Sequence, residues 1–146
     1  MRELKTPNLS ADVIIELMDY PGRPIVLIER QNPPFGFAVP GGFIDIGERV
    51  EEGARREAQE ETGLEVDLIA LLGLYSNPKR DPRFHTATAV YIAQAHGKPV
   101  AGDDAKDCQI VQVDNLPKQL AFDHSLVLSD YLNYRATGMV APLFKD

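Results

Sequence analysis

GFIDIGERVEEGARREAQEETGL, residues 42–64, is the stretch of this sequence that decides the fold. Its second half is dominated by Glu, Ala and Arg, and Gly63 is a residue of the kind that commonly lies just beyond a helix end. These features predict a helix of about three to four turns over residues 49–62. The Pro-rich and Gly-rich sequence over residues 31–48 predicts a long ordered loop around a short strand, and such loops usually carry function.

Three glutamates of the predicted helix share one face. At about 100° per residue, Glu60 and Glu61 lie at about −60° and +40° from Glu57. The apolar residues Val50 and Ala54 fall on an overlapping arc, so two of the three carboxylates should point toward the core. Like charges repel, and burial raises the cost of ionisation, so a compensating cation is expected. Hard carboxylate oxygens suit Mg²⁺ or Mn²⁺, with waters and a substrate phosphate completing the coordination.

A solvated acidic helix is the alternative interpretation of these charges. In that case Arg49, Arg55 and Arg56 would neutralise the glutamates at the surface. Only Arg56 lies near the three carboxylates on the helix, which weakens this alternative.

Length and composition predict one globular domain over residues 1–146. The chain is 44% hydrophobic and 25% charged, and no apolar run approaches the roughly 20 residues of a membrane span. A net charge of −7 without a basic stripe argues against nucleic acid as a partner. The N-terminus has no apolar leader, and the single cysteine, Cys108, cannot form an internal disulfide, so a cytoplasmic location is expected.

The remaining elements favour a mixed sheet. Residues 11–18 and 24–30 flank the turn sequence DYPGRP and predict a hairpin. Further strands are predicted over residues 37–39, 65–75, 86–95 and 108–113. A closing helix is predicted around the apolar positions Leu120, Val127, Leu128, Tyr131 and Leu132. Strands and helices do not alternate regularly, so the expected fold class is α/β with a mixed sheet between helices, not a doubly wound parallel sheet.

The spacing within residues 42–64 resembles the complete Nudix box. Its defined positions are filled by Gly42, Glu48, Arg56, Glu57, Ala58, Glu60, Glu61, Gly63 and Leu64. The resemblance implies a single Nudix domain with an α/β/α sandwich and a mixed β-sheet. It also implies divalent-metal-dependent hydrolysis of a nucleoside diphosphate linked to another moiety.

The same resemblance assigns roles to individual residues. It implies metal ligands at Glu57, Glu60, Glu61 and the carbonyl of Gly41. Arg56 would orient the carboxylates, and Glu48 would support the loop by pairing with a cation of the box. The metal, Mg²⁺ or alternatively Mn²⁺, would neutralise a pyrophosphate that a chain of charge −7 repels and would acidify or align the attacking water.

The general base has several candidates. In the family it is a box glutamate, here Glu60 or Glu61, or an acid in a loop outside the box. The external candidates are Asp103, Asp104 and Asp107 in AGDDAKDCQIV. Asp107 precedes a predicted strand at a place where related enzymes often carry Glu, and a solvated acidic loop is the alternative for the other two.

Two further segments, ERQNPPFGFAVPGGFIDIGE and SNPKRDPRFHTATAVYIA, resemble the small ADP-ribose pyrophosphatases of bacteria and archaea. Lys79, Arg80 and Arg83 form a basic patch that could bind a phosphate or ribose, since Arg makes bidentate phosphate contacts. Alternatively, Asp81 and Arg83 pair to hold a turn. His85 begins a strand and is either a substrate contact or a structural histidine.

The activity implied by these resemblances is magnesium-dependent hydrolysis of ADP-ribose or a similar nucleoside diphosphate derivative. For ADP-ribose the products would be AMP and ribose 5-phosphate. A hydrolase of nucleoside triphosphates and a non-catalytic nucleotide-sensing module remain the alternatives. The expected partner is a small nucleotide, and binding to nucleic acid or to a membrane is not expected. The resemblance also implies that the protein could form a homodimer.

Overall fold

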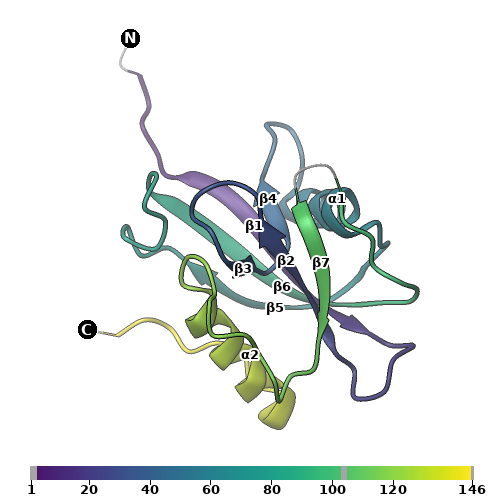
Figure 1. Ribbon diagram of the computed structural model, residues 1–146. Coiled ribbons are helices and arrows are strands. Elements are labelled where there is room, and N and C mark those ends of the chain that lie inside the picture. Colours follow the sequence, from purple (N-terminus) through teal and green to yellow (C-terminus); the bar gives the residue numbers. More distant parts are fainter. Residues whose placement is uncertain (1–2, 103–104, 146) are drawn as a thin grey trace.

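The computed structural model describes residues 3–102 and 105–145. Within them the chain forms seven strands and two helices, shown in Figure 1. In chain order these are β1 (Asn8–Leu17), β2 (Ile25–Arg30), β3 (Phe37–Ala38), β4 (Gly41–Phe43), α1 (Val50–Thr62), β5 (Asp67–Tyr75), β6 (Thr86–Ala95), β7 (Ala105–Val111) and α2 (His124–Thr137). None of the helices in this described part is long and apolar enough to cross a membrane.

All the predicted elements are present, with small shifts at their ends. Helix α1 begins one residue later than predicted because Arg49, with φ −70° and ψ 152°, is its extended N-cap, and it ends at Gly63, whose φ of 72° is left-handed. Helix α2 begins at His124, so Leu120 precedes it and instead forms an isolated bridge with Phe37. Strand β4 was not predicted, because its Gly-rich residues become a strand only by pairing with β1.

The sheet is mixed, as expected, with the strand order β3-β2-β1-β6-β5. Strand β1 runs parallel to β6 over its whole length, from Asn8↔Thr86 to Leu17↔Ala95. The other pairings are antiparallel: β5 with β6, β3 and β7 with β2, and β2 and β4 with β1.

Strand β1 changes partner along its length, and this change positions the site. Near its end it pairs with β2 at Glu16↔Ile25, whereas near its start it pairs with β4 over Ser10, Ala11 and Asp12. The sheet therefore forks between β1 and β2, and β3 and β4 enter the fork.

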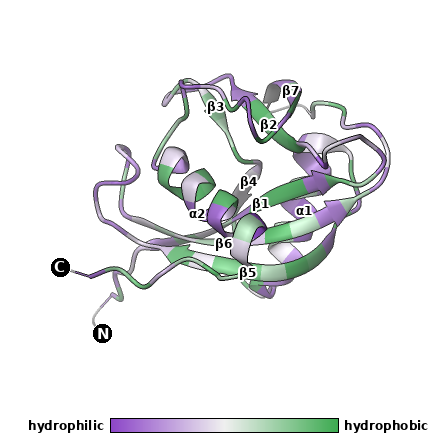
Figure 2. Cartoon of the chain, turned by 90° about the horizontal axis from the view of Figure 1, so that it is seen from below, coloured by the Kyte–Doolittle hydropathy of each residue, from purple (hydrophilic) through white to green (hydrophobic). Residues whose placement is uncertain are grey.

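Alternating side chains of β1 contact different helices. Val13 and Ile15 belong to a core cluster that includes Ala54 and Ala58 of α1. Ile14, between them, belongs to a second cluster that includes residues of α2. The helices therefore cover opposite faces of the sheet, which confirms the α/β/α sandwich. Figure 2 shows many hydrophobic residues along the central strands of the sheet.

Candidate active site

A cleft of about 330 Å³ opens at the fork of the sheet. Its lining comes from β1, β2, β3, β4, α1, the loop between β5 and β6, the start of β6 and the segment leading into α2. Polar and charged residues of both signs line it, including Asp12, Glu61, Arg30 and Arg83. Because these residues come from distant parts of the chain, only the folded molecule assembles the cleft.

Arg56 of α1 ties the helix to the loop that precedes it. Its Nη2 and Nε donate to the two carboxylate oxygens of Glu48 at 2.7 and 3.1 Å, and Nη2 also donates to the Phe43 carbonyl at 3.0 Å. Its Nη1 donates to Glu57 at 2.8 Å and lies 3.3 Å from Glu60. The hydrogen bond from Arg56 lowers the pKa of Glu48 below its ordinary value. Arg56 thus lies within hydrogen-bonding distance of three carboxylates at once.

Glu61 is the least satisfied carboxylate of the cleft. Its Oε2 is buried and has no hydrogen-bond partner among the described residues. Burial, followed by the charges of Glu57 and Asp12, raises the pKa of Glu61 to about 8, against the opposing effects of the Gly41 N–H and Arg30. Burial also raises the pKa of Glu57. Both carboxylates would be ionised at lower cost beside a cation.

Two glycines leave room for these carboxylates. A Cβ atom at Gly42 would collide with the carboxylate of Glu57, and one at Gly41 would collide with Asp12 and the backbone of Ala11. The glycines are therefore required by close approach, and not only by the conformation of a turn.

The donor set fits a divalent cation. Carboxylate oxygens are the ligands that Mg²⁺ and Mn²⁺ prefer, and among the described residues the buried Oε2 of Glu61 has none of the partners that a buried oxygen normally has. Within residues 3–102 and 105–145, however, no three His, Cys, Asp or Glu side chains are already gathered as a metal site. Glu57 and Glu60 are turned toward Arg56, and Glu60 has a 56% exposed side chain. Of the three box carboxylates, only Glu57 and Glu61 line the cleft.

A buried Asp12–His124 pair was missed by the sequence analysis. The Val39 N–H donates to Nδ1 of His124 at 3.0 Å, so the proton of a neutral imidazole lies on Nε2, which is 3.1 Å from Asp12 Oδ2. His124 is 2% exposed and Asp12 is 8% exposed. The available sequence signal was an acid within the apolar strand ADVIIEL, but nothing in the sequence linked it to a histidine on the last helix.

The basic loop before β6 contributes two arginines to the cleft. Arg83 pairs with Asp81 through Nε at 3.0 Å and Nη2 at 2.8 Å, so the turn-holding contact of the alternative interpretation is present while Arg83 also lines the cleft. Arg80 is buried and donates to Asp123 at 3.0 and 2.7 Å and to Thr88 at 2.6 Å. These contacts tie the loop to β6 and to the start of α2.

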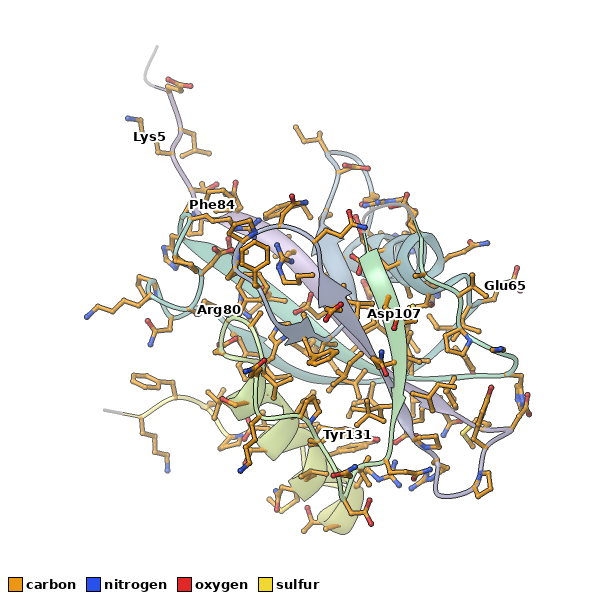
Figure 3. All side chains as sticks on the ribbon, viewed as in Figure 1. Lys5, Glu65, Arg80, Phe84, Asp107 and Tyr131 are labelled. Carbon is orange, nitrogen blue, oxygen red and sulfur yellow. The ribbon has the colours of Figure 1, made fainter. Side chains whose placement is uncertain are left out.

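The other predicted site residues do not line the cleft. Lys79 and His85 are exposed, and the ring of His85 contacts the Ser76 carbonyl at 2.9 Å. Asp107 is exposed on β7 and accepts a hydrogen bond from Gln109 at 2.6 Å. Figure 3 shows Arg80 and Phe84 on one side of the molecule and Asp107 on β7. The two remaining acids proposed as bases, at positions 103 and 104, lie outside the described residues.

Known proteins resemble this chain over most of its length. It is 46% identical over 132 residues to an ADP-ribose pyrophosphatase of Methanocaldococcus jannaschii, a match that covers 88% of this chain and 75% of that protein. It is 29% identical over 127 residues to the ADPR responsive transcriptional repressor NtrR of Acinetobacter baylyi, covering 82% of this chain and 50% of the repressor. The chain thus spans three quarters of one relative and half of the other.

A solved structure has the same fold. The NUDIX domain of Shewanella oneidensis NrtR, complexed with ADP ribose, superposes with a TM-score of 0.79 at 26% identity, covering 92% of this chain and 91% of that one. The family model of the NUDIX domain matches residues 7–131. That match, together with the box of residues 42–64 and its place at the fork of the sheet, shows that the chain belongs to the Nudix family.

Proposed function

We propose that this Nudix protein hydrolyses ADP-ribose to AMP and ribose 5-phosphate. The observation that carries the proposal is the buried oxygen of Glu61, which has no hydrogen-bond partner in the part of the chain that the structure describes, in a cleft that also holds arginines. Such a site offers oxygens to a cation and guanidinium groups to an anion, which are the two requirements of a metal-bound diphosphate. The 46% identity to an ADP-ribose pyrophosphatase supports the choice of substrate.

Mg²⁺ is the proposed ion, with Mn²⁺ as the alternative. The ion would be held by Glu57, Glu60, Glu61 and the Gly41 carbonyl. The contacts of Arg56 with Glu48 and Glu57 would hold the helix against the preceding loop, so that these ligands stay in place. When bound, the ion neutralises diphosphate oxygens and acidifies or aligns a water molecule.

The chemistry is attack of a water oxygen on one phosphorus of the diphosphate. The new P–O bond forms as the bridging P–O bond breaks, and the water proton passes to a base. Glu61 is the base best supported, because its carboxylate lines the cleft in which a substrate would lie. Glu60 and Asp107 are less well supported, since both are exposed and outside the cleft lining.

Arg83 is the proposed phosphate contact of the basic loop. Asp81 accepts from the Nε–H and from one N–H of Nη2, so both N–H groups of Nη1 and the second of Nη2 are the donors that would face the substrate. Arg80 would act indirectly, because its donors hold Asp123 and Thr88 and thereby place the loop.

Substrate profiling tests the proposal. Purified protein with Mg²⁺ would be offered ADP-ribose, nucleoside triphosphates, dinucleoside polyphosphates and nucleotide sugars, with a phosphatase added to release phosphate from the monoester products. We expect the highest kcat/KM for ADP-ribose and, in a parallel reaction without phosphatase, equal amounts of AMP and ribose 5-phosphate. A preference for triphosphates would instead identify a triphosphate hydrolase.

A nucleotide-sensing role is the second candidate, because one relative is an ADPR responsive repressor and a structural neighbour binds ADP ribose. The same profile separates the two roles, since a sensor would bind ADP-ribose without turnover. We further propose a single domain over residues 1–146 that acts in the cytoplasm as a homodimer. Light scattering coupled to gel filtration tests the homodimer.

A further inference from the structure

The Asp12–His124 pair lines the cleft but has no part in the proposed reaction. Nδ1 of His124 accepts a hydrogen bond from the Val39 N–H at 3.0 Å, and Nε2 lies 3.1 Å from Oδ2 of Asp12. Both ring nitrogens are therefore engaged with the protein itself. A general acid or base needs a nitrogen that faces the substrate, so His124 is not placed to transfer a proton there. Its contacts instead indicate a role in holding the site together.

Asp12 decides which ring nitrogen of His124 carries the proton. An ionised carboxylate only accepts hydrogen bonds, so the imidazole nitrogen that faces it must be the donor. The proton of a neutral ring therefore lies on Nε2, and the lone pair of Nδ1 is left for the Val39 N–H. At 8% and 2% exposure, Asp12 and His124 are shielded from the water that would otherwise compete for these contacts.

The Val39 N–H belongs to the backbone that leads into β4. Strand β4 begins two residues later at Gly41, and the carbonyl of the intervening Pro40 accepts a hydrogen bond from the Val13 N–H at 2.8 Å. The backbone from Val39 to Gly41 is thus held on one side by β1 and on the other by His124, the first residue of α2. The place of Gly41 depends on both supports.

Gly41 is the residue through which this support reaches the cation site. Its N–H opposes the rise in the pKa of Glu61, and its carbonyl is one of the proposed metal ligands. The packing leaves little room here, because a Cβ atom on Gly41 would collide with Asp12 and with the backbone of Ala11. A displacement of the Gly41 backbone would therefore move a donor and an acceptor relative to Glu61 at the same time.

The start of α2 is itself fixed, so His124 can serve as an anchor. The Ala121 N–H donates to the Phe37 carbonyl, and the Phe37 N–H donates to the Gln119 carbonyl, both at 2.8 Å. These bonds tie the segment before α2 to β3. The His124 ring also packs against the Phe122 ring, with centroids 5.3 Å apart. The imidazole is therefore held in place by its own segment as well as by its hydrogen bonds.

We propose that His124 is a positioning residue for the cation site, which sets the place of the Gly41 backbone through its contact with the Val39 N–H. Asp12 takes part by fixing the tautomer in which Nδ1 is the acceptor. The inference rests on the proposed function, because it takes the Gly41 carbonyl and the nearby carboxylates as ligands of the ion. It adds that the affinity for the ion depends on the first residue of the last helix, whose ring nitrogens face the protein.

Binding of Mn²⁺ alone, followed by electron paramagnetic resonance without substrate, tests the inference. In His124→Asn the amide oxygen can take the place of Nδ1 and accept from the Val39 N–H. In His124→Gln the amide nitrogen can take the place of Nε2 and donate to Asp12, but the acceptor for Val39 is lost. We expect His124→Gln to weaken Mn²⁺ binding at least about tenfold, the lower end for losing a residue that supports a metal ligand, and His124→Asn to stay within about threefold.

Tyr131→Phe is the control for lowered stability, because it removes a buried hydrogen bond to Glu16 on the same helix. It should keep the Mn²⁺ affinity of the wild type. Equal affinities in the wild type and His124→Gln, an equal loss in His124→Gln and His124→Asn, or no Mn²⁺ binding to the wild type would overturn the positioning role. If the affinities separate as expected while the wild type leaves ADP-ribose intact, the positioning role stands and the proposed substrate falls.

The tautomer is measured on the unaltered protein, so the test does not depend on the folding of a variant. In ¹⁵N-labelled, metal-free wild type at neutral pH, the nitrogen resonances of His124 should show an unprotonated Nδ1 and a protonated Nε2. The spectrum of His124→Asn, which lacks the ring, identifies these resonances. A protonated Nδ1 in the wild type would leave no acceptor for the Val39 N–H and would overturn the proposal.

Discussion

Two buried carboxylates of this protein, Glu16 and Glu61, have opposite surroundings. Glu16 is 3% exposed and accepts hydrogen bonds from Tyr131 at 2.7 Å and Gln94 at 3.3 Å, with Arg135 at 3.7 Å. Glu61 has a buried oxygen without a hydrogen-bond partner in the described chain and a pKa raised to about 8. The first carboxylate joins β1 to α2, whereas the second lines the cleft.

The difference separates structure from function. A buried carboxylate with a full set of partners holds elements together, and its removal lowers the free energy of unfolding. A buried carboxylate without partners costs stability and persists where a ligand supplies what the protein lacks. We therefore expect Glu16 to stabilise the framework and Glu61 to act in the proposed reaction, so substitutions at the two places should affect different measurements.

The largest effect is expected for Glu61→Gln. The amide keeps the shape but can neither take a proton nor bind a cation strongly, so kcat for ADP-ribose should fall at least about 10²-fold. The melting temperature should be unchanged or higher, because no buried charge remains. Glu52→Gln, at an exposed position of the same helix, is the control and should retain full activity. Normal turnover in Glu61→Gln would contradict the assignment.

Tyr131→Phe tests the other carboxylate. It removes the hydroxyl that donates to Glu16, and loss of a buried hydrogen bond to a charged group should lower the free energy of unfolding by about 1.5–3 kcal/mol. Activity per folded molecule should not change. Tyr134→Phe, on the same helix, should change stability by less than about 0.5 kcal/mol in the same urea titration. Equal losses in the two variants would show that the Glu16 contact contributes nothing.

The pH dependence of stability sharpens the comparison further. In metal-free buffer the folded Glu61 carboxyl, with its pKa raised to about 8, binds its proton more tightly than the same group in the unfolded chain, at about 4.5. The folded state therefore carries more protons, so this group makes stability fall as pH rises from about 4.5 to about 8, by at most about 1.4 kcal/mol per pH unit. Urea titrations at several pH values would give the free energy of unfolding, which should fall with pH more steeply for the wild type than for Glu61→Gln over that window. Equal pH dependences in the two proteins would contradict the raised pKa.

The smallest effect is expected from the metal alone. Mg²⁺ at about three times its Kd should stabilise the folded state by about 0.8 kcal/mol, which raises the melting temperature by about 2–3 °C. Glu61→Gln should lose most of this shift, while Tyr131→Phe should keep it despite a lower starting temperature. An identical shift in the wild type and Glu61→Gln would show that Glu61 is not a ligand.

The sequence predicted the local elements well because their causes are local. The Glu, Ala and Arg content of residues 49–62 and the glycine after them predicted α1 to within one residue. The spacing of Gly42, Glu48, Arg56 and Glu57 identified the family. Glu48 was expected to pair with a cationic side chain of the box, and in the structure it accepts a hydrogen bond from Arg56. Lys79 and His85 were chosen from composition and position alone, and they lie outside the cleft.

The sequence by itself determined helix α1, the strands other than β4 and the acidic residues of the box, because propensity, patterning and motif spacing act over a few neighbouring residues. Only the tertiary structure decided which acids are buried, which of them is left without a partner, and which residues join them. Asp12 contacts His124, and Arg30 contacts Phe122, although most of the sequence separates the two residues of each pair. Such contacts depend on how the sheet forks and on which face α2 covers, and no local pattern encodes that geometry.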